Sequence, residues 1–76
     1  MKGYIKTVNF EQSVEVSTRL RNIGIEPEYV NNGMLNSRTY IIDDVDRGIG
    51  KNAWTHINAN FGDKIECYLG DADMAE

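Results

Sequence analysis

The densest group of side chains that could do chemistry is acidic and lies at residues 43–46. Asp43, Asp44 and Asp46 stand within four positions of one another, directly after an apolar run. Adjacent carboxylates suit calcium, but an EF-hand loop needs further oxygen ligands, and no acidic residue follows until Asp63. We therefore expect Asp44 or Asp46 to cap the following helix, and the three carboxylates to contact a basic surface of a partner protein.

The segment Gly48-Ile49-Gly50-Lys51 has some of the residue types of a phosphate-binding loop. A P-loop requires a glycine five residues before the Gly-Lys pair and Ser or Thr directly after it. Val45 and Asn52 occupy those two positions, and the aspartates just upstream would repel a phosphate. The glycines are instead expected to permit a tight turn or close packing, and no cofactor is predicted.

The chain has one histidine and one cysteine, His56 and Cys67. Neither lies at a spacing typical of nucleophilic or general acid–base catalysis. A single cysteine forms neither an internal disulfide nor the usual cysteine-based zinc site. Cys67 alternates with Ile65 and Leu69, which is typical of an inward-facing strand position. We predict no catalytic residue, no metal site and a protein that is not an enzyme.

The elements that position these side chains are predicted in the order strand, helix, strand, strand, helix, strand. Asn9 followed by Gln12 favours a helix start, and Gly24 and Gly62 are typical of helix ends. Gly48 and Gly50 would weaken a helix, so the second helix is expected to begin near residue 51. The expected strands span residues 4–10, 25–31 (or 26–31), 38–43 and 64–69, and the expected helices span residues 10–23 and 51–61.

This order predicts an α+β fold, a ferredoxin-like two-layer sandwich with both helices on one face of an antiparallel sheet. The expected strand order is 4-1-3-2. Pro27 cannot donate a ladder hydrogen bond, so the second strand belongs at a sheet edge. Asn32-Gly33 favours a tight two-residue hairpin turn, whereas a wider loop over residues 31–37 would give another register. Met34 and Leu35 beside this turn form a candidate apolar contact site.

Four aromatic residues are further candidates for binding. Strand alternation predicts that Tyr4 and Tyr68 face away from the helices, with Tyr40 as a third member of the row. A row of tyrosines on an open sheet face resembles the stacking platform of an RNA-recognition module. A protein interface, where tyrosine is enriched, is the favoured interpretation. Trp54 lies beside the apolar stripe of its helix and is either a core edge or a binding anchor.

The composition limits the classes of protein to which the chain can belong. The 76 residues are 41% hydrophobic, which suits one small domain with a modest core. We expect this domain to span residues 1–70, with a flexible acidic tail at residues 71–76 whose Asp71 and Asp73 join the acidic contact surface. The formal charge of −4 makes nucleic acid an unfavourable partner. No apolar run is long enough for a signal peptide or a membrane span, so a cytoplasmic location is expected.

These patterns together predict a small, acidic, non-enzymatic protein-binding module. It would inhibit or regulate a partner protein by occlusion. Its size and charge would suit a phage-encoded protein that acts on a host system. The partner is expected to carry a basic surface, and no membrane is involved. A module that binds RNA or a small ligand through the tyrosine-bearing sheet face is the alternative. Because the sheet has two edge strands, two copies of the chain could also pair edge to edge as a homodimer.

Overall fold

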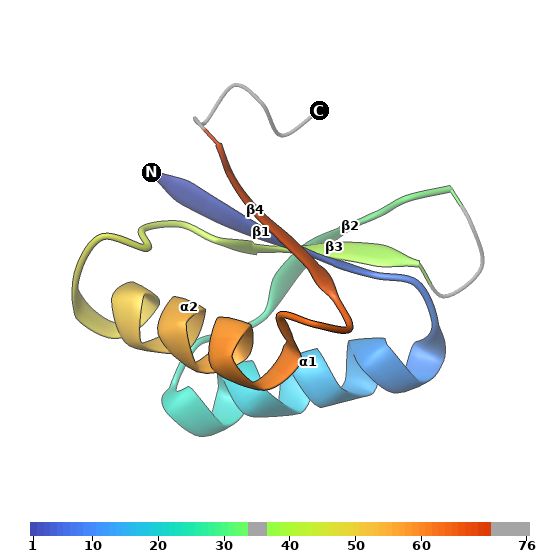
Figure 1. Ribbon diagram of the computed structural model, residues 1–76, viewed down its shortest axis with the longest axis horizontal. Helices are drawn as coiled ribbons and strands as arrows, with labels where there is room; N and C mark the ends of the chain where they lie inside the picture. Colours follow the sequence, from blue (N-terminus) through green and yellow to red (C-terminus); the bar gives the residue numbers. More distant parts are fainter. Residues whose placement is uncertain (34–36, 71–76) are drawn as a thin grey trace.

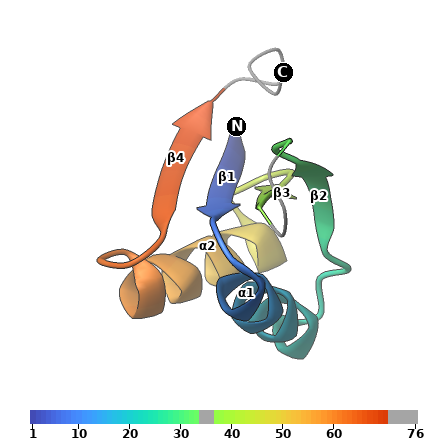
Figure 2. The ribbon, with the colours of Figure 1, turned by 90° about the vertical axis from the view of Figure 1, so that its right-hand side faces the viewer.

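The computed structural model of the protein describes residues 1–33 and 37–70, which form one layer of sheet and one layer of helices (Figure 1). The strand order is β2-β3-β1-β4, and every neighbouring pair is antiparallel. Both helices cover the same face of the sheet (Figure 2). The elements are β1 (Lys2–Thr7), α1 (Phe10–Ile23), β2 (Glu28–Asn31), β3 (Arg38–Ile42), α2 (Gly48–Phe61) and β4 (Glu66–Gly70).

The predicted α+β fold, with four antiparallel strands and two helices, is confirmed. The predicted strand order 4-1-3-2 is the observed order read from the other edge of the sheet. Pro27 immediately precedes β2, and β2 is an edge strand as expected. Neither helix, among the described residues, has the length and apolarity needed to cross a membrane.

The first helix has the bounds that its sequence predicts because local signals define both of its ends. The Asn9 side chain accepts a hydrogen bond from the Gln12 N–H at 2.8 Å, as an N-cap does. Gly24 adopts φ 109°, the left-handed conformation favoured at a helix C-terminus. The Ile25 N–H then donates to the Leu20 carbonyl at 2.9 Å, which completes a Schellman motif and directs Ile25 onto the core.

The second helix begins at Gly48, earlier than predicted, and its first turn makes a close backbone contact with the preceding connection. A Cβ atom on Gly50 would lie 1.7 Å from the Asp44 carbonyl oxygen, so only glycine allows the backbone to approach this closely. The expected cap is wrong. Arg47 occupies the N-cap position without a side-chain capping bond, and the Asp44 carboxylate instead accepts the Asp46 N–H at 3.0 Å.

The connection between β2 and β3 is the wider loop rather than a tight turn at Asn32-Gly33. Asn31 pairs with Arg38, and the Asn32 N–H donates to the Ser37 carbonyl at 3.0 Å. The prediction for Met34 and Leu35 lies outside the described residues. The same holds for the predicted flexible tail at residues 71–76, with Asp71 and Asp73.

The core lies between the helices and one face of the sheet. Ile5 pairs with both Tyr40 and Cys67, so these three side chains share the helix-covered face. Tyr40 is fully buried there, and its hydroxyl lies 2.6 Å from the Ser13 Oγ of α1. The prediction that Tyr40 faces the open side is therefore wrong. The core cluster contains Ile5, Val16, Leu20, Tyr40, Ile42, Val45, Ala53, Ile57, Phe61 and Ile65.

Candidate binding site

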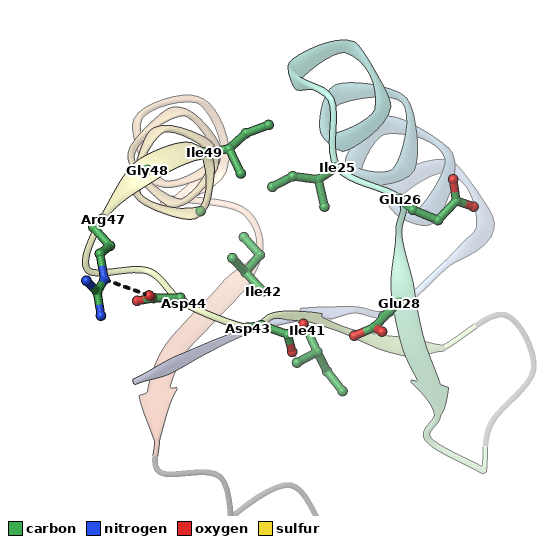
Figure 3. A pocket seen from close by; sticks show the side chains of 11 residues that line it. Ile25, Glu26, Glu28, Ile41, Ile42, Asp43, Asp44, Arg47, Gly48 and Ile49 are labelled. Atoms are coloured by element: carbon green, nitrogen blue, oxygen red, sulfur yellow. Dashed lines mark hydrogen bonds and ion pairs between the residues drawn. The ribbon is translucent and has the colours of Figure 1, made fainter.

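A cavity of about 490 Å³ opens at one end of the sandwich, where α1 leads into β2 and β3 leads into α2 (Figure 3). Its walls come from two segments that are separated in the sequence, residues 25–28 and 41–50. The antiparallel pairing of β2 with β3 places the start of β2 beside the end of β3. The contact between Gly50 and the Asp44 carbonyl holds the first turn of α2 against that same end. The cavity is thus a direct product of the chain topology.

The inner wall of the cavity is apolar. Ile25 enters from the end of α1, Ile42 from the end of β3 and Ile49 from the first turn of α2. In Figure 3 the side chains of Ile25 and Ile49 point toward each other, and Ile42 lies below them, nearer the sheet. This wall offers branched aliphatic surface to a ligand without any buried charge. It suits the hydrocarbon part of an amphipathic group.

The rim of the cavity is acidic. Glu28, Asp43 and Asp44 line its edge, where Glu28 (paired with Ile41) and Asp43 (beside Lys2) belong to the open face of the sheet, whereas the side chain of Glu26 points away from the cavity in Figure 3. One guanidinium, that of Arg47, also lines it. Carboxylates therefore outnumber cations on the lining, and the edge of the cavity carries a negative potential.

The carboxylates differ in how far they are neutralised. Asp44 accepts from the Asp46 N–H and from the Arg47 Nε at 3.3 Å. Asp43 lies 3.7 Å from the Lys2 Nζ, and both side chains are solvent-accessible. The Glu28 carboxylate forms no hydrogen bond or ion pair within residues 1–33 and 37–70. Asp43 and Glu28 are therefore the carboxylates best able to receive a cation.

Acid is expected to destabilise the protein partly through Asp44. The hydrogen bond from the Asp46 N–H, opposed by partial desolvation and reinforced by Arg47, holds the pKa of Asp44 below its ordinary value of 3.8. A carboxyl whose pKa is lowered by folding contributes stability above its unfolded-state pKa and loses it as the pH falls through the folded-state pKa. Urea unfolding at neutral pH and near pH 3 should therefore show a smaller acid-induced loss in Asp44→Ala than in the unaltered protein.

Asp43→Ala provides the control for that experiment. Asp43 is exposed, receives no backbone hydrogen bond and has only the long contact with Lys2. Its removal should leave the acid-induced loss of stability nearly unchanged. Parallel pH profiles for Asp44→Ala and the unaltered protein would contradict the role given to the Asp44 carboxylate.

The residues of the predicted acidic surface do not all lie at one site in the structure. Asp43 and Asp44 line the cavity, but the Asp46 carboxylate lies 3.3 Å from the Met1 ammonium and does not line it. Glu26 and Glu28, on either side of Pro27, were missed from the sequence. The predicted hairpin carried the necessary signal, because an antiparallel β2–β3 pair brings residue 28 close to residue 43.

The open face of the sheet does not present three exposed tyrosines. The rings of Tyr4 and Tyr68 stack there with centroids 5.3 Å apart, as alternation predicted. Tyr4 is only 2% exposed, however, and Tyr68 is 40% exposed. Tyr40 lies on the opposite face. Of the three predicted residues, only Tyr68 offers an accessible ring, so the expected stacking platform is not formed by them.

The structure also defines the environment of Trp54, His56 and Cys67, which were named from the sequence. Trp54 is half-buried against the core, and its ring lies so close to Gly3 that a Cβ there would be 2.7 Å from it. His56 accepts a hydrogen bond at its Nε2 from the Arg19 Nη1 at 2.9 Å, which links α2 to α1. Burial, with a smaller effect of Glu66, raises the pKa of the Cys67 thiol.

Comparison of the sequence with models of protein families and with curated proteins, and of the structure with solved structures, finds no match. Within the described part of the chain, no three His, Cys, Asp or Glu side chains are grouped so that they could hold a metal ion. The function must therefore be inferred from the shape and charge of the molecule itself. The acidic cavity is a concave feature with converging polar groups, as ligand sites usually are.

Proposed function

We propose that this chain is a small, non-enzymatic protein-binding module with a ferredoxin-like sandwich fold. It receives a lysine or arginine side chain of a partner protein in the acidic cavity. The observation that carries this proposal is the combination of an isoleucine wall with the weakly neutralised carboxylates of Glu28 and Asp43. Occlusion of a basic surface on the partner would make the module an inhibitor or regulator.

The chemistry of the cavity favours a long basic side chain over a compact cation. Lysine and arginine carry an aliphatic stem that packs on apolar surface while the charged end stays with polar groups. Ile25 and Ile49, which lie over the buried Ile42, suit the stem, and the rim carboxylates suit the charged end. A small inorganic ion would gain nothing from the isoleucine wall. The volume of about 490 Å³ also falls within the usual range of about 300–1,000 Å³ for ligand pockets.

The alternative of an RNA-binding module loses its main support. That function required a row of accessible tyrosines, and Tyr40 is buried on the other face of the sheet. Stacking by Tyr68 alone offers one ring. The formal charge of −4 also opposes association with a polyanion.

Short peptides test the proposal directly. Acetyl-Gly-Arg-Gly-amide and its lysine analogue should shift the amide signals of residues 25–28 and 41–50 in a ¹H–¹⁵N spectrum, and the glutamine analogue should not. The double variant Glu28→Gln/Asp43→Asn should weaken binding of the arginine peptide about tenfold, because it removes the charges that face the cation. The peptide titration gives the dissociation constant in each case.

Glu11→Gln/Glu15→Gln is the matched control. It changes the net charge by the same amount, but both residues lie on the exposed side of α1 and do not line the cavity. Its affinity for the arginine peptide should equal that of the unaltered protein. Equal weakening by both double variants would show that the peptide responds only to net charge, and shifts outside the cavity would place binding elsewhere; either result overturns the proposal.

A further inference from the structure

A second concave site, of opposite charge, lies beside α1 and centres on Arg38. No carboxylate within the described ranges 1–33 and 37–70 forms an ion pair with this guanidinium, although the chain has 12 acidic residues. Neutral groups hold it instead. Its Nη1 donates to the Ser13 Oγ at 3.3 Å and to the Tyr40 hydroxyl at 3.4 Å, and its central carbon lies 4.3 Å from the centroid of the Tyr29 ring. Arg38 is thus oriented without being neutralised.

The concavity has a volume of about 200 Å³, and its polar lining consists of guanidinium and hydroxyl groups. Arg21 adds a second guanidinium, and Ser13, Ser17 and Thr18 add hydroxyl groups. Ser13, Ser17 and Arg21 follow one another at intervals of four residues, which places them on one face of α1 beside the start of β3. No carboxylate lines this space. The site is therefore complementary to an oxyanion.

The hydroxyl network beneath Arg38 supports this electrostatic character. The Tyr40 hydroxyl accepts a hydrogen bond from the Ser17 Oγ at 2.7 Å and shares one with the Ser13 Oγ. Burial alone would raise the pKa of Tyr40, but the hydrogen bonds with Ser13, Ser17 and Arg38 together hold it below its ordinary value. The surroundings thus stabilise negative charge at this point even on a buried phenol.

The rim of the concavity is apolar on one side. Phe10 is 63% exposed and Val14 is 45% exposed, and both line the space. Neither is a member of the core cluster of the domain. A ligand whose oxygen atoms meet the arginines would therefore place its adjoining carbon atoms against these two side chains. An inorganic anion would leave this surface uncovered.

We propose that this concavity binds the phosphate group of a small phosphate monoester. Arg38 and Arg21 supply the cationic donors, Thr18 supplies a hydroxyl donor, and the ester carbon packs against Phe10. Two guanidiniums and the Thr18 hydroxyl match the three terminal oxygens of a phosphate dianion better than the two oxygens of a carboxylate. This site is independent of the acidic cavity, and it stands whether or not a basic side chain binds there.

Phenyl phosphate and inorganic phosphate are the probes. At constant ionic strength, phenyl phosphate should bind saturably, shift the amide signals of residues 10–21 and 38–40, and bind more tightly than inorganic phosphate. Arg21→Gln and Arg38→Gln should each weaken phenyl phosphate binding at least about tenfold, because each removes a charge-assisted contact. Arg21 forms no ion pair in the described structure, so its variant tests the site even where Arg38→Gln impairs folding.

Arg47→Gln is the charge-matched control, because Arg47 pairs with Asp44 at the acidic cavity and does not line the basic one. Its affinity for phenyl phosphate should be unchanged. Equal weakening by Arg47→Gln, or no weakening by Arg21→Gln, would overturn the proposal. Equal affinity for the two probes would assign the site to free phosphate rather than to a monoester. Displacement of phenyl phosphate by single-stranded oligouridylate would assign it to a nucleic acid backbone, which also overturns the proposal.

Discussion

Replacement of Gly50 with alanine is expected to lower the free energy of unfolding by about 3 kcal/mol or more, at the upper end for overpacking a close contact. The added Cβ would lie 1.7 Å from the carbonyl oxygen of Asp44. Both partners in this clash belong to the backbone, so no side-chain rotation relieves it. The first turn of α2 would have to move away from the end of β3. That movement would also deform the acidic cavity, which both residues line.

Urea unfolding of Gly50→Ala measures this effect, and Gly33→Ala is the control. Gly33 has φ +85°, and an added Cβ there would meet no atom of the described residues within 4 Å. Its replacement should cost only the conformational strain of about 1–2 kcal/mol that a left-handed residue imposes. A Gly50→Ala variant no less stable than Gly33→Ala would contradict the close approach of α2 to Asp44.

Replacement of Tyr40 with phenylalanine is expected to lower the free energy of unfolding by about 2 kcal/mol, because it leaves buried polar groups without their partner. The lost hydroxyl lies 2.6 Å from the Ser13 Oγ and receives the hydrogen bond of Ser17. Ser13 is buried, so water does not replace the missing partner. Arg38 would also lose one of the groups that orient it, and phenyl phosphate binding should weaken with it.

Tyr68→Phe is the matched control for this substitution. Tyr68 is exposed on the other face of the sheet, and its ring stacks on that of Tyr4. Loss of its hydroxyl should change the free energy of unfolding by no more than about 0.5 kcal/mol, as is usual for surface substitutions. Both variants should be compared by urea unfolding. Equal stability of the two would show that the hydroxyl network of Tyr40 contributes nothing measurable.

Elements with local signals were predictable from the sequence, and elements set by distant contacts were not. The first helix was predicted with its observed bounds because Asn9, Gln12 and Gly24 specify its ends through bonds to near neighbours. The start of the second helix was misplaced because the glycine propensity at Gly50 is outweighed by its contact with Asp44, which no local pattern reveals.

The same distinction explains the site residues. Tyr40 was assigned to the wrong face because strand parity was judged without the register that pairs it with Ile5. Asp43 and Asp44 were found because they are adjacent in sequence. Glu28 joins them only through the β2–β3 pairing. The basic concavity was missed entirely, because its two arginines stand 17 positions apart in the chain, at residues 21 and 38.

The position of the acidic cavity at the ends of the elements has a consequence for how binding preference can change. Glu28 and Asp43 are exposed and belong to no core cluster, whereas Gly50 and Ile42 are buried. Different residues thus determine which ligand binds and how stable the fold is. The carboxylates can be exchanged for amides, or even for lysines, without disturbing the packing beneath them. The same fold can therefore carry a cavity rim of different charge, provided that the close contact of Gly50 with the Asp44 carbonyl is kept.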